Sequence, residues 1–156
     1  MSFQIRALPR AAFAPLFDLS DAQLRAHGAV RRVVDQKPGF PCRVSLEDAE
    51  VGERVLLVNF EHQAAATPYR ARHAVFVREH ALEAQPAVGE IPEVLRRRLI
   101  SVRAFDAAGM MVDADVVDGQ LLEFAVTRML ANPAAAYLHL HNAKPGCYAA
   151  RVDRAD

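Results

Sequence analysis

The segment AYLHLHNAKPGCYAARVD, residues 136–153, contains two runs of alternating apolar and polar residues on either side of a turn. Successive side chains of an extended strand point to opposite faces, so the two leucines of the first run share one face. The opposite face then carries Tyr137, His139 and His141. The second run begins at Cys147, and the Pro-Gly pair between the runs favours a reversal of the chain. The segment therefore predicts two strands joined by a turn.

Three other segments have the composition of strands. SFQIRAL, residues 2–8, alternates like a half-buried strand, whereas RVLLVNF, residues 54–60, is a nearly continuous apolar run. Such a run is typical of an interior strand that is covered on both faces. HAVFVRE, residues 73–79, is rich in valine and phenylalanine, and we expect it to pair with residues 54–60 across a long loop.

A hairpin is predicted over residues 100–117, where ISVRAF, DAAG and MMVDADVV follow one another. Asp106 and Gly109 are typical of a type I turn that ends in a left-handed glycine. Counting back from this loop in steps of two places Arg103 opposite Asp113. We therefore expect these two side chains to form an ion pair across the strands.

Two helices are indicated, and a further helical turn is expected at PEVLRR, residues 92–97, with proline at its first position. GQLLEFAVTRMLA, residues 119–131, repeats apolar side chains at the spacing of an amphipathic helix, and Asp118 is placed to cap it. Ser20 and Gln23 form a capping box, which predicts a short helix over residues 21–27. The fold class expected is α+β. It consists of a mainly antiparallel sheet of about six to eight strands, one long amphipathic helix (119–131) and one or two short helices, all in a single domain, 1–156.

Composition excludes several classes of protein. The 156 residues include 19 basic and 19 acidic side chains, so no net charge attracts nucleic acid or a membrane surface. No apolar run approaches the roughly 18 residues of a spanning helix, and arginines and prolines interrupt the opening segment where a signal peptide is continuously apolar. We expect a cytoplasmic protein with reduced thiols at Cys42 and Cys147.

The histidine face of residues 136–142 suggests a metal site. Two imidazoles at this spacing, His139 and His141, can bind one divalent ion through ring nitrogens, provided that a third ligand completes the set. The candidates for that third ligand are His62, Asp113 and Asp115. The simpler alternative is the solvated or polar-packed face of an edge strand. A metal cofactor is therefore possible but not favoured.

The turn between the two C-terminal strands suggests an anion site. Its Pro-Gly pair can expose backbone N–H donors beside the cation of Lys144, an arrangement that suits a carboxylate or a phosphate. Cys147 is a candidate nucleophile if a neighbouring histidine lowers its pKa, and a buried cysteine that only fills space is the alternative. Cys42 and Arg43 follow a similar Pro-Gly turn earlier in the chain.

Several long motifs resemble a bacterial family catalogued as domain of unknown function 1203. These motifs are FPCRVSLEDAEVGE (40–53), LLVNFEHQ (56–63), TPYRA (67–71), MMVDADVVDG (110–119) and HLHNAKPGCYAARVDR (139–154). The resemblance covers nearly the whole chain and implies one bacterial domain. The family has no established activity or cofactor, so the resemblance assigns no role to any residue.

These features favour a small cytoplasmic enzyme or small-ligand-binding domain with a pocket suited to an anionic ligand or a metal. The alternative is a non-enzymatic interaction domain, expected to be a homodimer, whose polar strand face and KPG turns form the interface. Four side chains are candidates for catalysis: His62, His139, His141 and Cys147. Four others are candidates for ligand binding: Cys42, Arg43, Asn142 and Lys144.

Overall fold

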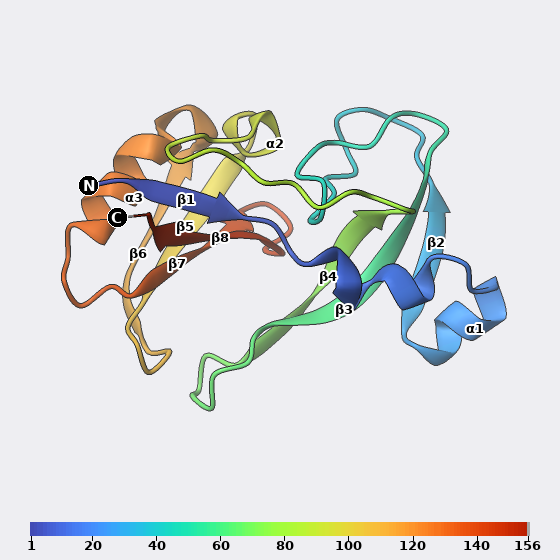
Figure 1. Ribbon diagram of the computed structural model, residues 1–156, viewed down its shortest axis with the longest axis horizontal. Coiled ribbons are helices and arrows are strands. Elements are labelled where there is room, and N and C mark those ends of the chain that lie inside the picture. Colours follow the sequence, from blue (N-terminus) through green and yellow to red (C-terminus); the bar gives the residue numbers. More distant parts are fainter. Residues whose placement is uncertain (156) are drawn as a thin grey trace.

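The computed structural model describes residues 1–155 and contains two antiparallel β-sheets (Figure 1). The five-stranded sheet has the order β1-β8-β7-β5-β6, and the three-stranded sheet has the order β2-β3-β4. The strands of the first are β1 (Phe3–Arg6), β5 (Leu99–Phe105), β6 (Met111–Asp118), β7 (Tyr137–Asn142) and β8 (Tyr148–Arg154). Those of the second are β2 (Ala29–Val33), β3 (Arg54–Gln63) and β4 (Ala71–Arg78). The expected α+β class with mainly antiparallel pairing is confirmed.

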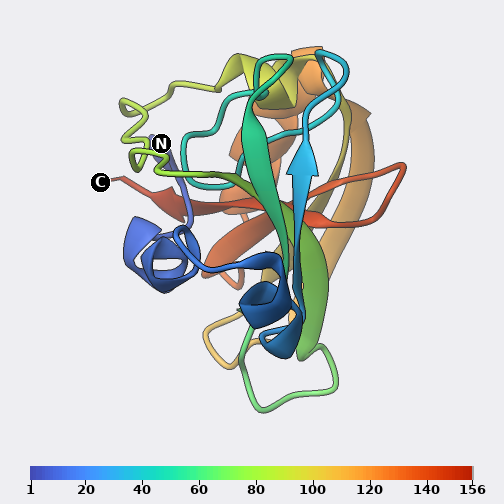
Figure 2. The same cartoon turned by 90° about the vertical axis from the view of Figure 1, so that its right-hand side faces the viewer.

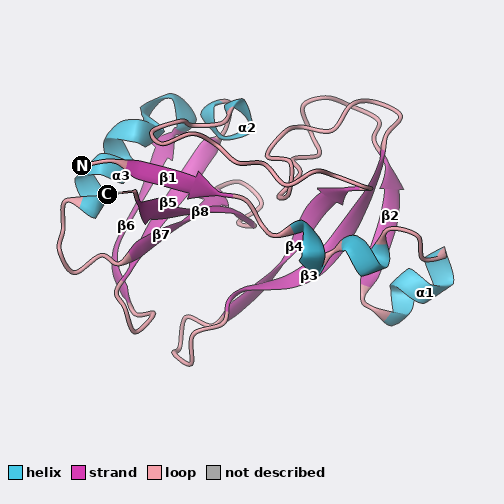
Figure 3. Ribbon diagram, viewed as in Figure 1, coloured by secondary structure: helices cyan, strands magenta, loops and turns pink. Residues whose placement is uncertain are grey.

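The helices are few and short, and α3 lies against the five-stranded sheet while α1 lies beside β2 (Figure 3). The α-helices are α1 (Asp21–Ala26), α2 (Glu93–Arg96) and α3 (Leu122–Leu130). Single 3-10 turns occupy η1 (Arg10–Ala12), η2 (Ala14–Leu16) and η3 (Gly119–Leu121). Across residues 1–155, none of the helices has the length and apolar character needed to cross a membrane.

The two faces of β7 have different surroundings, as the alternation predicts. Leu138 and Leu140 are fully buried in the main hydrophobic core, together with Leu122 and Val126 of α3. This apolar face is therefore the one that α3 covers. The opposite face of β7 contacts the three-stranded sheet through side chains of β3. In Figure 2 the neighbouring β8 runs crosswise behind β4, which it contacts.

A helix is present within the range predicted, 119–131, and its apolar face is buried, but a single long α-helix is not confirmed. The chain instead forms the 3-10 turn η3 followed by the nine-residue helix α3. Asp118 does cap this segment, because its carboxylate accepts from Gln120 N. The N–H of Gly119, however, donates to Arg98 O at 2.7 Å, and a Cβ on Gly119 would lie 2.1 Å from Leu95 O. This close approach to a distant segment fixes a tight first turn.

The predicted ion pair between Arg103 and Asp113 is also wrong. The turn forms as expected, with Gly109 at φ +87°, but a bulge after Ala104 shifts the register by one residue. Asp113 therefore lies opposite Ala104, on the face that carries α3, and its carboxylate pairs with Arg128 at 3.3 Å. Arg103 points to the opposite face, toward the three-stranded sheet.

The three-stranded sheet confirms two local predictions. β3 is its central strand, and Val55 and Leu56, which point to opposite faces, are both fully buried. The capping box of α1 is present, because Ser20 Oγ accepts from Gln23 N while the Gln23 side chain accepts from Ser20 N. Both features depend on residues close together in the chain.

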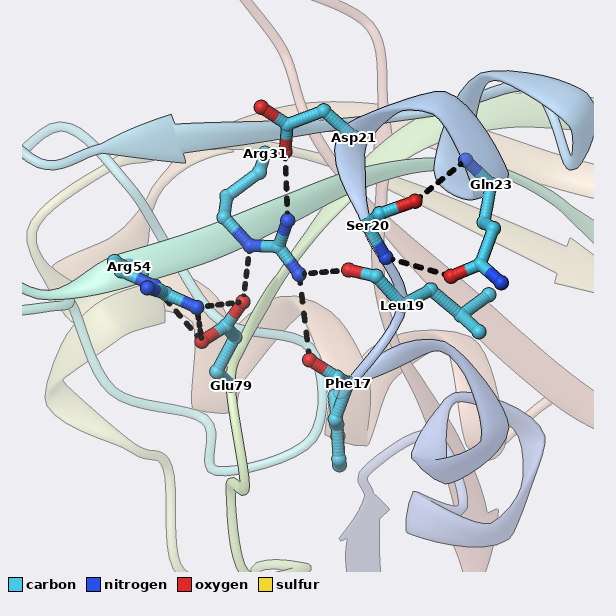
Figure 4. Close-up of polar contacts among 8 residues, drawn as sticks. All are labelled: Phe17, Leu19, Ser20, Asp21, Gln23, Arg31, Arg54 and Glu79. Carbon is cyan, nitrogen blue, oxygen red and sulfur yellow. Dashed lines mark hydrogen bonds and ion pairs between the residues drawn. The ribbon is translucent and has the colours of Figure 1, made fainter.

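An arginine of β2 holds α1 against this sheet (Figure 4). Arg31 donates to the Asp21 carboxylate at 2.7 Å and to Leu19 O at 2.7 Å. Its Nε donates to Glu79, whose carboxylate also pairs with Arg54 at 3.0 Å. The side chains of Arg31 and Glu79 are largely shielded from water, so this pair connects α1, β2 and the end of β4.

Replacing Glu79 tests this connection. We expect Glu79→Gln to lower the free energy of unfolding by about 1–3 kcal/mol, because two arginines lose a charged acceptor. Urea unfolding followed by circular dichroism measures the change. The matched control is Glu50→Gln, which breaks an exposed pair with Lys37 and should have a smaller effect. Equal losses in both variants would contradict the role given to Glu79.

Candidate functional site

Four histidines gather where the two sheets face each other. His62 comes from β3, His73 from β4, and both His139 and His141 come from β7. The ring of His62 lies 5.1 Å from that of His141 and 5.8 Å from that of His139, centroid to centroid. The ring of Tyr148 stacks on His62 at 4.9 Å. The sequence candidates His62, His139 and His141 are therefore brought together, and His73 joins them.

Two β-bulges lie at this cluster. In the β3–β4 pair the register skips His62, because Glu61 and Gln63 face adjacent residues of β4. His62 contacts the histidines of β7, and the next residue, Gln63, donates to the hydroxyl of Tyr137 at 2.9 Å. A bulge lets successive residues point to the same side, so both side chains reach the five-stranded sheet. The second bulge lies between Leu140 and His141 in the β7–β8 pair.

Hydrogen bonds fix some of the ring nitrogens and leave others free. His62 Nε2 lies 2.7 Å from His73 Nδ1, and His141 Nδ1 lies 2.9 Å from Gly146 O. Since a carbonyl oxygen only accepts, His141 Nδ1 must carry the proton in that bond. Within residues 1–155, the buried Nδ1 atoms of His62 and His139 have no hydrogen-bond partner. Buried polar atoms of this kind are rare and mark a place where another group can bind.

The clustered histidines are neutral at neutral pH. Burial, with smaller contributions from neighbouring charges such as Arg103, lowers the pKa of His139 and His141 to about 3. Burial and the neighbouring His73 lower the pKa of His62 to about 4. β7 is an interior strand between β8 and β5, and His139 and His141 are 3% and 1% exposed. The alternative is therefore wrong in making β7 a solvated edge strand, whereas polar packing of its histidine face is present.

A cavity of about 620 Å³ adjoins the cluster, and His73 contributes to its wall. Its apolar wall is formed by Gly39, Pro41, Leu57, Ala74, Phe76, Leu99, Ala143 and Pro145. Its polar wall is formed by His73, Arg43, Arg97, Arg98, Asn142, Lys144 and Cys147. None of these residues is acidic, so cations dominate the polar wall.

Arg43 is the most unusual of the lining residues, because it is only 2% exposed. Its guanidinium donates to Pro41 O at 2.5 Å, to Tyr148 O at 2.8 Å and to Cys147 Sγ at 2.8 Å. Burial lowers the pKa of Arg43, but a guanidinium keeps its proton in proteins. In the part of the chain that the structure describes, Arg43 forms no ion pair with a carboxylate, so the cavity contains a positive charge without a counter-ion.

Asn142 supplies a second unpaired group in the same cavity. It is 4% exposed, and its Oδ1 has no hydrogen-bond partner among residues 1–155. Its Nδ2 lies 3.9 Å from Cys147 Sγ, which makes the thiol a neighbour of both Asn142 and Arg43. Lys144 is exposed at the same cavity. Of the eight sequence candidates, Arg43, Asn142, Lys144 and Cys147 thus line one cavity.

Other candidates lie elsewhere. Cys42 is 1% exposed, and its Sγ accepts from the backbone N–H groups of Ser45 and Arg78, both at 3.3 Å. The carboxylates of Asp113 and Asp115, candidates for a third metal ligand, both pair with Arg128 of α3. The structure thus places Cys42 outside the cavity wall and the two aspartates apart from the histidines.

Sequence patterns did not single out His73, Arg97 or Arg98. His73 lies opposite Phe60 in the β3–β4 register, so the predicted pairing of these two segments already brought it near His62. Arg97 and Arg98 both reach the buried carboxylate of Asp48, at 3.3 Å and 2.6 Å. No local pattern reveals that contact, because about 50 residues separate the partners.

The two thiols should differ in reactivity. We expect iodoacetamide to alkylate Cys147 of the native chain faster than Cys42, because Cys147 lines the cavity whereas Cys42 is buried. Mass spectrometry of tryptic peptides identifies the labelled residue. Cys147→Ser should remove the fast reaction and Cys42→Ser should preserve it. Fast labelling of Cys42 in the native chain would contradict the structure.

The histidine cluster should make the protein sensitive to acid. A histidine with a pKa of about 6.5 in the unfolded chain and about 3 in the folded chain binds a proton only on unfolding between these values. Stability is therefore complete above about pH 6.5 and falls by roughly 1.4 kcal/mol per pH unit for each such histidine as the pH drops.

Urea unfolding between pH 7.5 and pH 5, after dialysis against a chelator, measures this slope. His139→Leu should reduce the slope by roughly 1.4 kcal/mol per pH unit, the contribution of one histidine, because the variant takes up one proton fewer on unfolding. The control His27→Leu changes an exposed histidine outside the cluster and should keep the slope. An unchanged slope in His139→Leu would show that His139 takes up protons equally in the folded and unfolded chains, which would contradict its lowered pKa.

Comparison with known proteins connects these residues to a family. A family model with the description "Protein of unknown function (DUF1203)" matches residues 39–154. The matched range includes all four clustered histidines and every residue of the cavity wall. No curated protein matches the chain, and no solved structure matches it.

Proposed function

The chain belongs to the DUF1203 family, and for it we propose the binding of a small organic anion in the cavity between the two sheets. The uncompensated guanidinium of Arg43 carries this proposal. A buried charge is costly unless it is paired, so an anionic group bound beside Arg43 would be stabilised strongly. Lys144 supplies a second cation, at the exposed side of the wall.

The shape and the wall of the cavity indicate what kind of anion fits. A volume of about 620 Å³ lies in the range of cavities that hold small organic molecules. Leu57, Phe76 and Leu99 provide apolar surface, which an inorganic ion would leave unused. The ligand therefore combines an apolar body with a carboxylate or phosphate group. A hydrogen-bond donor on it would satisfy the free Oδ1 of Asn142.

Arg97 and Arg98 add less positive charge to the cavity wall than two unpaired arginines would. Both pair with Asp48, whose side chain is 1% exposed, so the three side chains together carry one net positive charge. Arg98 approaches both oxygens of that carboxylate, at 3.0 Å and 2.6 Å, and its guanidinium is held in place. The pair of arginines thus supports the positive wall, while Arg43 is the buried arginine of that wall that has no carboxylate partner among residues 1–155.

Ligand binding is favoured over catalysis in which Cys147 is the nucleophile and a histidine is its base. A cysteine that acts as a nucleophile with a histidine base needs that histidine within hydrogen-bond reach of its sulfur. The side-chain partners of Cys147 Sγ in residues 1–155 are Arg43 and Asn142, and no histidine donates to it or accepts from it there. The histidines proposed as its bases instead contact one another.

Part of the interface expected for a homodimeric interaction domain is not available on the surface of the chain. Its interface was expected on the polar face of β7, yet His139 and His141 lie inside this chain, between its own sheets. The KPG turns remain available, because Lys37 and Lys144 are both exposed. Light scattering of the purified chain tests that alternative, and a stable dimer would support it.

The two lysines of the chain provide a matched test of anion binding, since both precede a Pro-Gly pair. Lys144 lines the cavity, whereas Lys37 pairs with Glu50 and lies outside it. The probes are benzoate, phenyl phosphate and octanoate, with benzamide as the neutral analogue of benzoate. We expect at least one anion to bind, measured by calorimetry, and to protect Cys147 from iodoacetamide.

Lys144→Ala should weaken that binding by about 10-fold, which corresponds to the loss of one charge-assisted hydrogen bond, and Lys37→Ala should not change it. The proposal fails if no anion binds or protects Cys147. It also fails if benzamide binds as well as benzoate, or if the two lysine variants weaken binding equally.

A further inference from the structure

Three histidines of the cluster bring ring nitrogens into a small volume. One nitrogen each from His62, His139 and His141 lies within 4.8 Å of the other two. Imidazole nitrogens that bind one tetrahedral zinc ion at 2.0–2.1 Å are separated by about 3.4 Å. The rings therefore have to approach by roughly 1 Å to close around an ion. Side chains that meet from two different sheets can make such an adjustment by small changes of rotamer.

The hydrogen bonds around these rings leave lone pairs free for a metal. Because His141 Nδ1 donates to Gly146 O, the opposite nitrogen, Nε2, is unprotonated and can act as a ligand. If His62 Nε2 donates to His73 Nδ1, then His62 Nδ1 is likewise unprotonated, and it is one of the buried atoms without a partner. The other buried ring nitrogen without a hydrogen-bond partner in residues 1–155 is His139 Nδ1.

We propose that His62, His139 and His141 form a binding site for a divalent transition-metal ion, of which zinc fits the ligands best. Neutral imidazoles suit zinc, copper and nickel, whereas calcium and magnesium require oxygen ligands. Three protein ligands leave one position of a tetrahedral ion open for water or a substrate. His62 is only partly buried, which provides a route of entry for the ion.

Nearby arginines oppose a bound cation but do not prevent its binding. Arg103 and Arg151 flank His139 as its partners in the neighbouring strands, and both favour the neutral imidazole that a metal requires. Arg151 is paired with Asp153 and its side chain is 42% exposed, so solvent screens its repulsion. Glu61, the residue before His62, favours a positive charge there, but its carboxylate is already paired with Arg70, so its effect on a bound ion is small.

His73 supports the site by holding the ring of His62 in place. Its Nδ1 accepts from His62 Nε2 in the arrangement that leaves His62 Nδ1 unprotonated. His73 also lines the anion cavity. A partner of this kind orients the ligand ring, and its loss commonly weakens metal binding by about 10–100-fold. His73 therefore acts as a positioning residue that lies between the metal site and the cavity.

Cobalt(II) titration of the full chain, free of any affinity tag and treated with a chelator, tests the proposal. We expect one equivalent of cobalt to bind with the intense visible absorption of a low-coordinate nitrogen site, and zinc to displace it. His62→Ala, at the partly buried ligand, should weaken cobalt and zinc binding by about 100-fold or more, since a direct ligand is lost. His73→Phe should weaken it less, by about 10–100-fold.

Matched variants separate this site from other effects. His27→Ala removes an exposed histidine outside the cluster, and Lys144→Ala changes only the anion cavity, so both should bind metal like the unaltered chain. The proposal is overturned if the unaltered chain shows no visible cobalt band and binds zinc with a Kd weaker than about 10 μM. It is also overturned if His27→Ala and His62→Ala weaken binding equally. X-ray absorption of the zinc-loaded chain, which requires no variant to fold, must show three imidazole ligands.

Discussion

The buried guanidinium of Arg43 is the interaction on which the meeting of the two sheets depends. Its side chain donates to Tyr148 O and Cys147 Sγ at the start of β8. Its backbone accepts from Leu8 N at 2.9 Å and donates to Phe76 O of β4 at 3.0 Å. A buried charge is tolerated only where acceptors surround it, so these segments are constrained to converge on one residue. Arg43 thereby links β4 to β8.

The histidine cluster follows from that constraint. With the start of β8 held in place, the ring of Tyr148 stacks on His62 and meets the edges of His139 and His141. The interface between the sheets is therefore aromatic and polar, whereas the other face of β7 lies in an aliphatic core. The two proposed sites use this interface in different ways and meet at His73. A neutral group of imidazoles suits a metal, and an uncompensated guanidinium suits an anion.

The sequence-based predictions departed from the structure at two places, one set by a contact between distant segments and the other by an irregularity inside a hairpin. The helix that begins at Asp118 has a tight 3-10 first turn, because Gly119 packs against the carbonyl groups of Leu95 and Arg96. Arg103 missed its predicted partner because a bulge moved the register by one residue, and a shift of one residue sends a side chain to the other face. The alternation of neighbouring residues reveals neither the packing of Gly119 nor the position of the bulge.

The sequence by itself determined the α+β class, the strands with clear alternation, the capping box at Ser20 and the two faces of β7, because each depends on residues a few positions apart. It also pointed to His62, Arg43 and Asn142 by residue type. Only the tertiary structure decided that His62 joins the histidines of β7 and that Arg43 shares a cavity with Cys147. Those contacts join residues far apart in the chain, and their geometry depends on how two separate sheets pack.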